Sequence, residues 1–157
     1  MKLIIIIISV IILIYTICYY IFPTEISILQ TDINDFNFSN LSKRQPIVIS
    51  DFIQDPLKII ESWFNYNFKS KLENDSNNDW VHNNYKYLFI HALQDTEVII
   101  YNASRKKEPP LSTDKIIIIK LQKNQSLILP FKWKYCANNI DVWGIDDLIT
   151  SSFGKFF

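Results

Sequence analysis

The two histidines are the side chains of this sequence best suited to acid–base chemistry or metal binding, and the chain holds no others. His82 follows Trp80 in a polar stretch, where a plain loop residue is the expected role. His91 lies in an alternating segment, with Asp95 four residues later. On a strand that spacing separates the two side chains by about 13 Å, which is too far to share one ion. We therefore expect His91 to be a hydrogen-bonded sheet residue.

Other catalytic motifs are missing from the sequence. The two glycines, Gly144 and Gly154, exclude a P-loop, a Gly-rich phosphate cradle and a GxSxG nucleophile turn. Cys136 has no histidine near it in the sequence, so we expect an inert thiol. Two Cys and two His exclude a disulfide scaffold and a Cys-rich zinc module. The sequence thus leans toward a protein that is not an enzyme.

Charge argues against a nucleic-acid partner. Sixteen basic and sixteen acidic side chains give no net charge, so no basic field would attract phosphates. The segment Lys132–Tyr135 mixes cations with aromatic rings, which could suit base stacking or a lipid headgroup. Without a wider basic patch, Trp133 is expected to fill the core. Arg105–Lys107 is expected to be a solvated loop.

The elements that must position these residues are one helix and a series of short strands. Asp55 and Pro56 form a helix start, followed by an apolar stripe to about Tyr66. Alternation or apolar β-branched runs then predict strands. The expected strands are 46–50, 85–91, 97–101, 115–121, 127–129 and 140–145, with a short helix over 146–153. The pattern predicts a mainly β (α+β) domain, a small sandwich or barrel with one packed amphipathic helix.

Two details of this pattern make sharper predictions. Gln94 and Asp95 are expected to form a hairpin turn that pairs the strands on either side of it. The unbroken isoleucines of 115–121 indicate a strand buried on both faces.

The N-terminal segment predicts a membrane anchor. Residues 3–22 carry no charge and, as a helix, would span about 30 Å, the hydrocarbon thickness of a bilayer. The long run and the lack of a small-residue cleavage site favour an uncleaved anchor over a signal peptide. The expected division is a transmembrane anchor at 1–23, a stem at 24–43 and a domain at 44–157. The bilayer is the one partner this predicts.

Orientation follows from the charges that flank the predicted anchor. Lys2 precedes it, whereas Glu25, Asp32 and Asp35 follow before any further lysine. The positive-inside rule then places the N-terminus in the cytoplasm and the C-terminal domain in a lumen or outside the cell. Five Asn-x-Ser sequons would be glycosylation candidates there. They begin at Asn37, Asn40, Asn74, Asn102 and Asn124.

The order of segments over residues 44–150 resembles the cupin-like, JmjC-type hydroxylases. Residues 44–49 are similar to that family's opening "RPVVI" strand, and 87–101 to its next hairpin. The most specific match is 117–135, which is similar to "VxLxPGDxLxIPxxWWH". In that motif Asn124 stands for glycine, and asparagine tolerates a positive φ, so the turn can survive. The resemblance implies a double-stranded β-helix fold with Fe(II) and 2-oxoglutarate as cofactors.

The ligand positions depart from that family's pattern. Its two-His, one-carboxylate iron site uses an HxD motif and a distant His. The matching positions are His82, Asn84 and Tyr135, so an amide and a phenol replace two ligands. The resemblance therefore leaves vestigial candidates and no expected metal, cofactor or catalytic residue.

Three hypotheses follow. The first is a membrane-tethered, non-catalytic cupin-like module with a structural or interaction role and an unknown protein partner. Its composition and anchor look like uncharacterised membrane proteins of large DNA viruses, which would place it in a host or virion membrane. The second is a divergent Fe(II)/2-oxoglutarate hydroxylase that recruits Asp79 or Asp95 to His82. The third is a glycosylated ectodomain that contacts another protein.

Overall fold

The computed structural model describes residues 2–21, 27–73, 79–102, 110 and 115–153. The helices are α1 Lys2–Ile21, α2 Phe38–Ser42, α3 Pro56–Trp63 and α4 Leu148–Phe153. The strands are β1 Leu29–Thr31, β2 Ile47–Ile49, β3 Phe68–Leu72, β4 Val81–His82, β5 Tyr87–Ala92, β6 Thr96–Asn102, β7 Ile116–Leu121, β8 Ser126–Pro130, β9 Trp133–Cys136 and β10 Ile140–Asp146.

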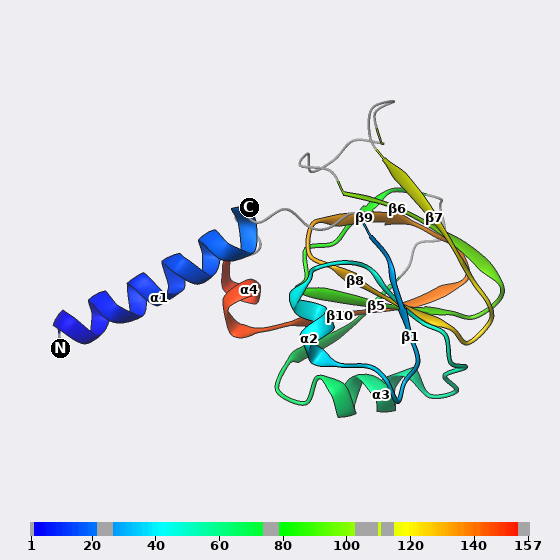
Figure 1. Cartoon of the computed structure of the whole chain (residues 1–157), viewed down its shortest axis with the longest axis horizontal. Coiled ribbons are helices and arrows are strands. Elements are labelled where there is room, and N and C mark those ends of the chain that lie inside the picture. Colours follow the sequence, from blue (N-terminus) through cyan, green and yellow to red (C-terminus); the bar gives the residue numbers. More distant parts are fainter. Residues whose placement is uncertain (1, 22–26, 74–78, 103–109, 111–114, 154–157) are drawn as a thin grey trace.

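The strands form two sheets that face each other (Figure 1). Sheet A has the order β1-β2-β8-β5-β10-β3, and sheet B has the order β4-β9-β6-β7. All strand pairs described are antiparallel except β1 with β2. From β7 onward successive strands alternate between the sheets, so each connection crosses the sandwich. The predicted mainly β sandwich with a packed helix is confirmed.

The space between the sheets is filled by apolar side chains. Strand alternation sends Leu88 and Ile90 of β5 inward from sheet A, and Ile100 of β6 inward from sheet B. These three side chains are almost completely buried. Around them pack Val48, Ala92, Val98, Ile119, Leu121, Leu127, Leu129, Trp133, Tyr135, Ile140 and Val142. The middle of the sandwich is therefore a packed core.

Helix α3 covers the outer face of sheet A (Figure 1). Asp55 caps it by accepting a hydrogen bond from the Lys58 amide at 3.2 Å, and Pro56 opens its first turn. Ile60 and Phe64 are buried against the outward side chains of sheet A. The predicted helix start is confirmed. The stripe is shorter than predicted, because the helix ends at Trp63 and Tyr66 is exposed.

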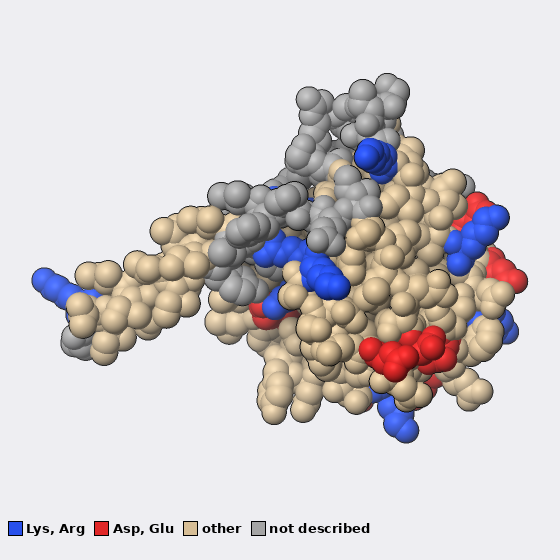
Figure 2. Space-filling view, in the orientation of Figure 1, with Lys and Arg blue, Asp and Glu red and all other residues tan. Residues whose placement is uncertain are grey.

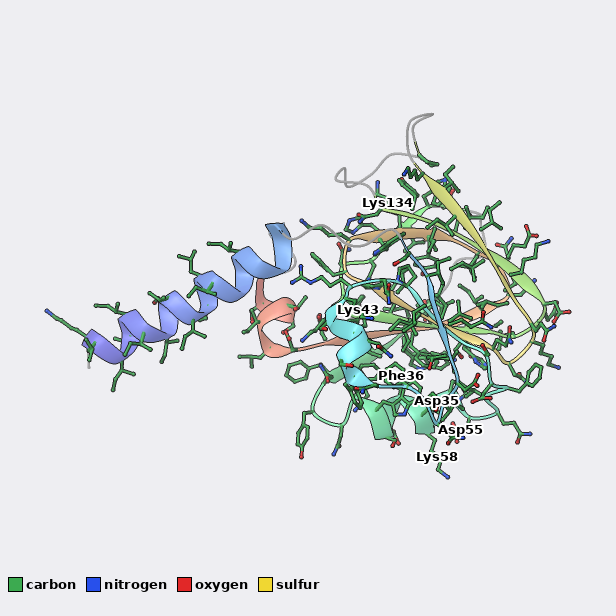
Figure 3. The ribbon with its side chains drawn as sticks, in the orientation of Figure 1. Asp35, Phe36, Lys43, Asp55, Lys58 and Lys134 are labelled. Atoms are coloured by element: carbon green, nitrogen blue, oxygen red, sulfur yellow. The ribbon has the colours of Figure 1, made fainter. Side chains whose placement is uncertain are left out.

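The segment predicted as a stem takes part in the domain. Strand β1 extends sheet A by pairing Gln30 with Val48. Phe36, labelled in Figure 3, stacks on Trp63 of α3 with ring centroids 4.0 Å apart. Asn37 caps α2 by accepting from the Ser39 amide. These contacts give residues 29–42 a defined place on the sheet.

Two sequence predictions about strands are wrong. The strands on either side of Gln94 and Asp95 do not pair, because β5 lies in sheet A and β6 in sheet B. The run 115–121 is not buried on both faces, because β7 is an edge strand whose Ile116 and Ile118 are exposed. The turn at Asn124 does survive, with φ at 69° as the resemblance implies.

The predicted membrane anchor is also wrong. Its residues do form a helix, α1, whose described side chains up to Leu13 and Ile14 are largely exposed. Crossing a bilayer takes about 20 predominantly apolar helical residues in succession. Within the described residues, however, no helix meets the combined requirement of length and apolar character. This finding overturns the transmembrane helix at 1–23 and the single-pass localisation, with its orientation, that rested on it.

Candidate functional site

The three vestigial ligand candidates do not share one face. His82 Nδ1 lies 3.0 Å from Asn84 Oδ1, so these two side chains meet. His82 pairs across strands with Lys134, whereas Tyr135 pairs with Val81. Side chains of neighbouring residues on a strand point to opposite faces, and Tyr135 belongs to the core between the sheets. The geometry therefore offers no common centre for an ion.

Neither of the two carboxylates considered from the sequence, Asp79 and Asp95, is placed with this set. Asp95 accepts a hydrogen bond from the Lys123 amide at 2.8 Å, far along the chain from His82. Asp79 is exposed, and its charge acts on Cys136. No cluster of three or more His, Cys, Asp or Glu side chains exists among the described residues. The residues present do not fit an Fe(II) site of the two-His, one-carboxylate type.

Tyr135 is a buried neutral phenol. Burial raises its pKa to about 12. At neutral pH the hydroxyl keeps its proton, which disfavours Tyr135 as an anionic metal ligand.

This shift makes Tyr135 a source of alkaline instability. Because its folded pKa of about 12 lies above the ordinary value of 10.0, its stabilising contribution is complete below pH 10 and is lost between pH 10 and 12. We expect Tyr135→Phe to remove this part of the pH dependence. Urea denaturation of both proteins between pH 8 and 11 measures it. Identical pH dependence in the two proteins would contradict the assignment.

His91 lies in a row of polar residues on sheet A. Its Nδ1 is 2.9 Å from Ser126 Oγ of β8, and Asp141 of β10 pairs with it on the other side. The order Ser–His–Asp resembles a nucleophilic triad, but His91 and Ser126 are buried, so a substrate cannot reach the hydroxyl. Burial lowers the pKa of His91, and the charge of Asp141 partly opposes this. His91 is the hydrogen-bonded sheet residue that the sequence predicts.

The lowered pKa of His91 predicts acid sensitivity. In the folded state the imidazole binds a proton less readily than in the unfolded chain, where the pKa of this side chain has its ordinary value of 6.5. Stability is then complete above pH 6.5 and falls as the pH drops through the interval below it, by at most about 1.4 kcal/mol per pH unit. We expect His91→Gln to flatten this fall in denaturation curves between pH 4.5 and 8. Parallel curves for the two proteins would refute the assignment.

The aromatic and basic segment of β9 is mostly buried. Trp133 is fully buried in the core, as predicted. Lys134, labelled in Figure 3, is 2% exposed, and its Nζ lies 5.4 Å from the Tyr101 ring centroid. Buried rings cannot stack on bases, so the rings of Trp133 and Tyr135 are not available for that role. Arg105–Lys107 lies outside the described residues.

The side chain of Cys136 is partly buried. Burial, and then the charge of Asp79, raise the pKa of its thiol. The thiolate is therefore disfavoured, which supports the expected inert role.

A cavity of about 750 Å³ lies at one end of the sandwich. Its walls are Phe68, Ser70, Asn84, Tyr85, Asp146, Thr150 and Ser151, from β3, β10, α4 and the segment after β4. Register pairs Ser70 with Gly144 and Phe68 with Asp146, so these positions share the inner face of sheet A. The described walls of the cavity thus come from the inner face of sheet A, the Asn84–Tyr85 segment and α4.

Asn83 holds the segment that closes this cavity. Its side-chain Nδ2 donates to the carbonyls of Leu129 and Pro130 at 3.1 and 2.7 Å, and its Oδ1 accepts from the Tyr85 amide at 2.8 Å. The residue is completely buried. Sequence reasoning did not assign it a role, because nothing distinguishes it from Asn84 beside it.

The Tyr85 ring forms the boundary between cavity and core. A Cβ at Gly144 would lie 2.6 Å from Cδ1 and Cε1 of that ring. The ring therefore rests directly on the glycine backbone of β10. Of the residues singled out from the sequence, only Asn84 lines the cavity.

Comparisons with known proteins give a likeness of fold alone. No family model matches the chain, and no curated protein does. Among solved structures, dTDP-4-dehydrorhamnose 3,5-epimerase from Bacillus anthracis str. Ames, crystallised with TDP and PPi, is similar at 14% identity and a TM-score of 0.31. The match covers 51% of this chain and spans about half (52%) of the epimerase chain. A viral origin and a JmjC relationship stay predictions.

Proposed function

We propose that this chain is a non-catalytic interaction module built on a cupin-like β-sandwich. The observation that carries the proposal is the close apolar packing between the two sheets, which leaves no room in the middle of the sandwich for a metal with open coordination positions. The separation of His82 and Asn84 from Tyr135 supports it. Catalysis by a facial-triad metal needs open coordination positions beside converging ligands. The arrangement favours binding over turnover.

The competing hypothesis is a divergent Fe(II)/2-oxoglutarate hydroxylase centred on His82. Metal analysis of the full chain after anaerobic loading with Fe(II), followed by measurement of succinate from 2-oxoglutarate, separates the two. We expect substoichiometric iron and no succinate above the level of the matched His82→Ala variant. One iron per chain, with succinate formation that His82→Ala abolishes, would overturn the proposal.

A further inference from the structure

The cavity at the end of the sandwich has the chemistry of a ligand site that no catalytic role uses. Its volume of about 750 Å³ lies in the range of small-molecule sites. Unlike the core beneath it, it is walled by hydroxyl, amide and carboxylate groups together with two aromatic rings.

One polar group of this wall, the hydroxyl of Thr150, is buried without a hydrogen-bond partner among the described residues. Its side chain lines the cavity and is 4% exposed. Its Oγ1 has no hydrogen-bond partner within the described part of the chain, although its amide donates to Asp147 Oδ1 at 2.7 Å. Buried hydroxyls are rarely left unsatisfied, because desolvation without a hydrogen bond costs free energy. Because Oγ1 itself is buried, the Thr150 side chain would have to rotate about χ1 to offer this hydroxyl to a ligand in the cavity.

Charge narrows the class of ligand. Among the described lining residues the ionisable wall group is the carboxylate of Asp146, and none is Lys or Arg. The nearby ammonium of Lys86 is directed to Asp147, with Nζ and Oδ2 2.6 Å apart. Both signs of charge are present on the face displayed in Figure 2. An anionic ligand such as a nucleotide or an oxoacid would face repulsion without a counter-charge.

The two aromatic residues of the cavity wall restrict the class of ligand further. Phe68 is 56% exposed on the inner side of β3, and the Tyr85 ring forms another wall. Exposed rings beside hydroxyl, amide and carboxylate groups complement a molecule with an apolar C–H face and a rim of hydroxyls. Each sugar hydroxyl both donates and accepts, which matches Thr150, Ser70 and Asn84 on one side and Asp146 on the other.

From this geometry we infer that the end cavity is a carbohydrate-binding site for a neutral mono- or disaccharide. The inference rests on the proposed function, because it gives the non-catalytic module a ligand class. Phe68 and Tyr85 contact the C–H face of the sugar ring, while Thr150 and Asp146 bind its hydroxyls.

Saturation-transfer NMR on the full chain tests this, with methyl glycosides of glucose, galactose, mannose and N-acetylglucosamine as probes. We expect transfer to at least one of them and none to glucuronate or 2-oxoglutarate. Thr150→Val is isosteric and removes only the orphan hydroxyl, so it should weaken binding about tenfold, the value of one hydrogen bond. It should not lower the thermal stability of the free protein, because the hydroxyl it removes is buried without a partner. Phe68→Ala should weaken it similarly. Phe52→Ala, also at an exposed Phe but outside the cavity, is the matched control and should leave binding unchanged.

Absence of transfer to all four neutral probes would overturn this proposal, and so would a preference for the anionic compounds or binding unaffected by Phe68→Ala. These outcomes are distinct from failure of the proposed function. Iron-dependent succinate formation would refute the non-catalytic role whatever the sugars do, whereas missing sugar transfer leaves that role intact.

Discussion

Asn83→Ala is expected to lower the free energy of unfolding by about 3–5 kcal/mol. The substitution removes three side-chain hydrogen bonds in a completely buried place. It leaves the carbonyls of Leu129 and Pro130 and the amide of Tyr85 without these partners, and each buried unsatisfied group costs roughly 1–3 kcal/mol. The segment that closes the end of the sandwich then loses its fixation to β8. Urea denaturation at pH 7 measures the change.

The neighbouring Asn84→Ala is the matched control. Asn84 is exposed, and its side chain bonds only the partly exposed His82. Surface changes of this kind usually stay within about 0.5 kcal/mol. Both variants delete an asparagine side chain, at neighbouring positions. The loss in the free energy of unfolding should nevertheless be at least fivefold larger for Asn83→Ala than for Asn84→Ala. Equal costs for the two variants would show that the buried network of Asn83 does not stabilise the fold.

This contrast shows how much of the site the sequence could reveal. In the sequence Asn83 and Asn84 are equivalent polar residues between two apolar segments. The comparison with an HxD motif drew attention to the outer positions, His82 and Asn84, and away from the middle one. Burial decides which asparagine matters, and burial here comes from contacts with residues 46 or more positions away. No local pattern contains that information.

More of the fold than of the site could be predicted from the sequence, because the patterns that indicate helices and strands are local. The Asp55–Pro56 start and the apolar stripe that follows need only the helical period, and α3 forms as predicted. Alternation likewise located most of the strands. It did not tell which sheet each strand joins, since a turn such as Gln94–Asp95 suits a hairpin and a sheet crossing equally well. The edge position of β7 was missed for the same reason.

The end cavity also could not be predicted from local sequence patterns. Its walls come from residues 68–70, 84–85 and 146–151, which only sheet register brings together. Phe68 and Thr150 are unremarkable in sequence, and Gly144 was noted only as one of two glycines. The scarcity of glycine was nevertheless a usable signal, because a glycine within a predicted strand often marks close approach by another group.

Gly144→Ala is expected to destabilise the protein by about 1–3 kcal/mol, the usual cost of overpacking. The new Cβ would lie 2.6 Å from two atoms of the Tyr85 ring and 2.7 Å from a third, well inside the ordinary contact distance of about 3.5–4.0 Å. Because these are atoms of the ring body, the whole Tyr85 side chain must move. The cavity beside it gives the ring a direction in which to go. Denaturation measures the cost, and Tyr85 ring chemical shifts report the displacement.

A double-mutant cycle with Tyr85→Ala separates this clash from any other effect of the extra methyl group. Tyr85→Ala alone removes a ring that packs against the core and should also destabilise. In that background the clash partner is gone and Gly144 has no positive φ to preserve. Gly144→Ala should then be neutral or stabilise by about 0.4–1 kcal/mol, through the reduced entropy of the unfolded chain. The two substitutions must therefore couple by more than about 1 kcal/mol. Additive costs would mean that the ring does not rest on the glycine, and that another contact of β10 sets its position at the boundary between cavity and core.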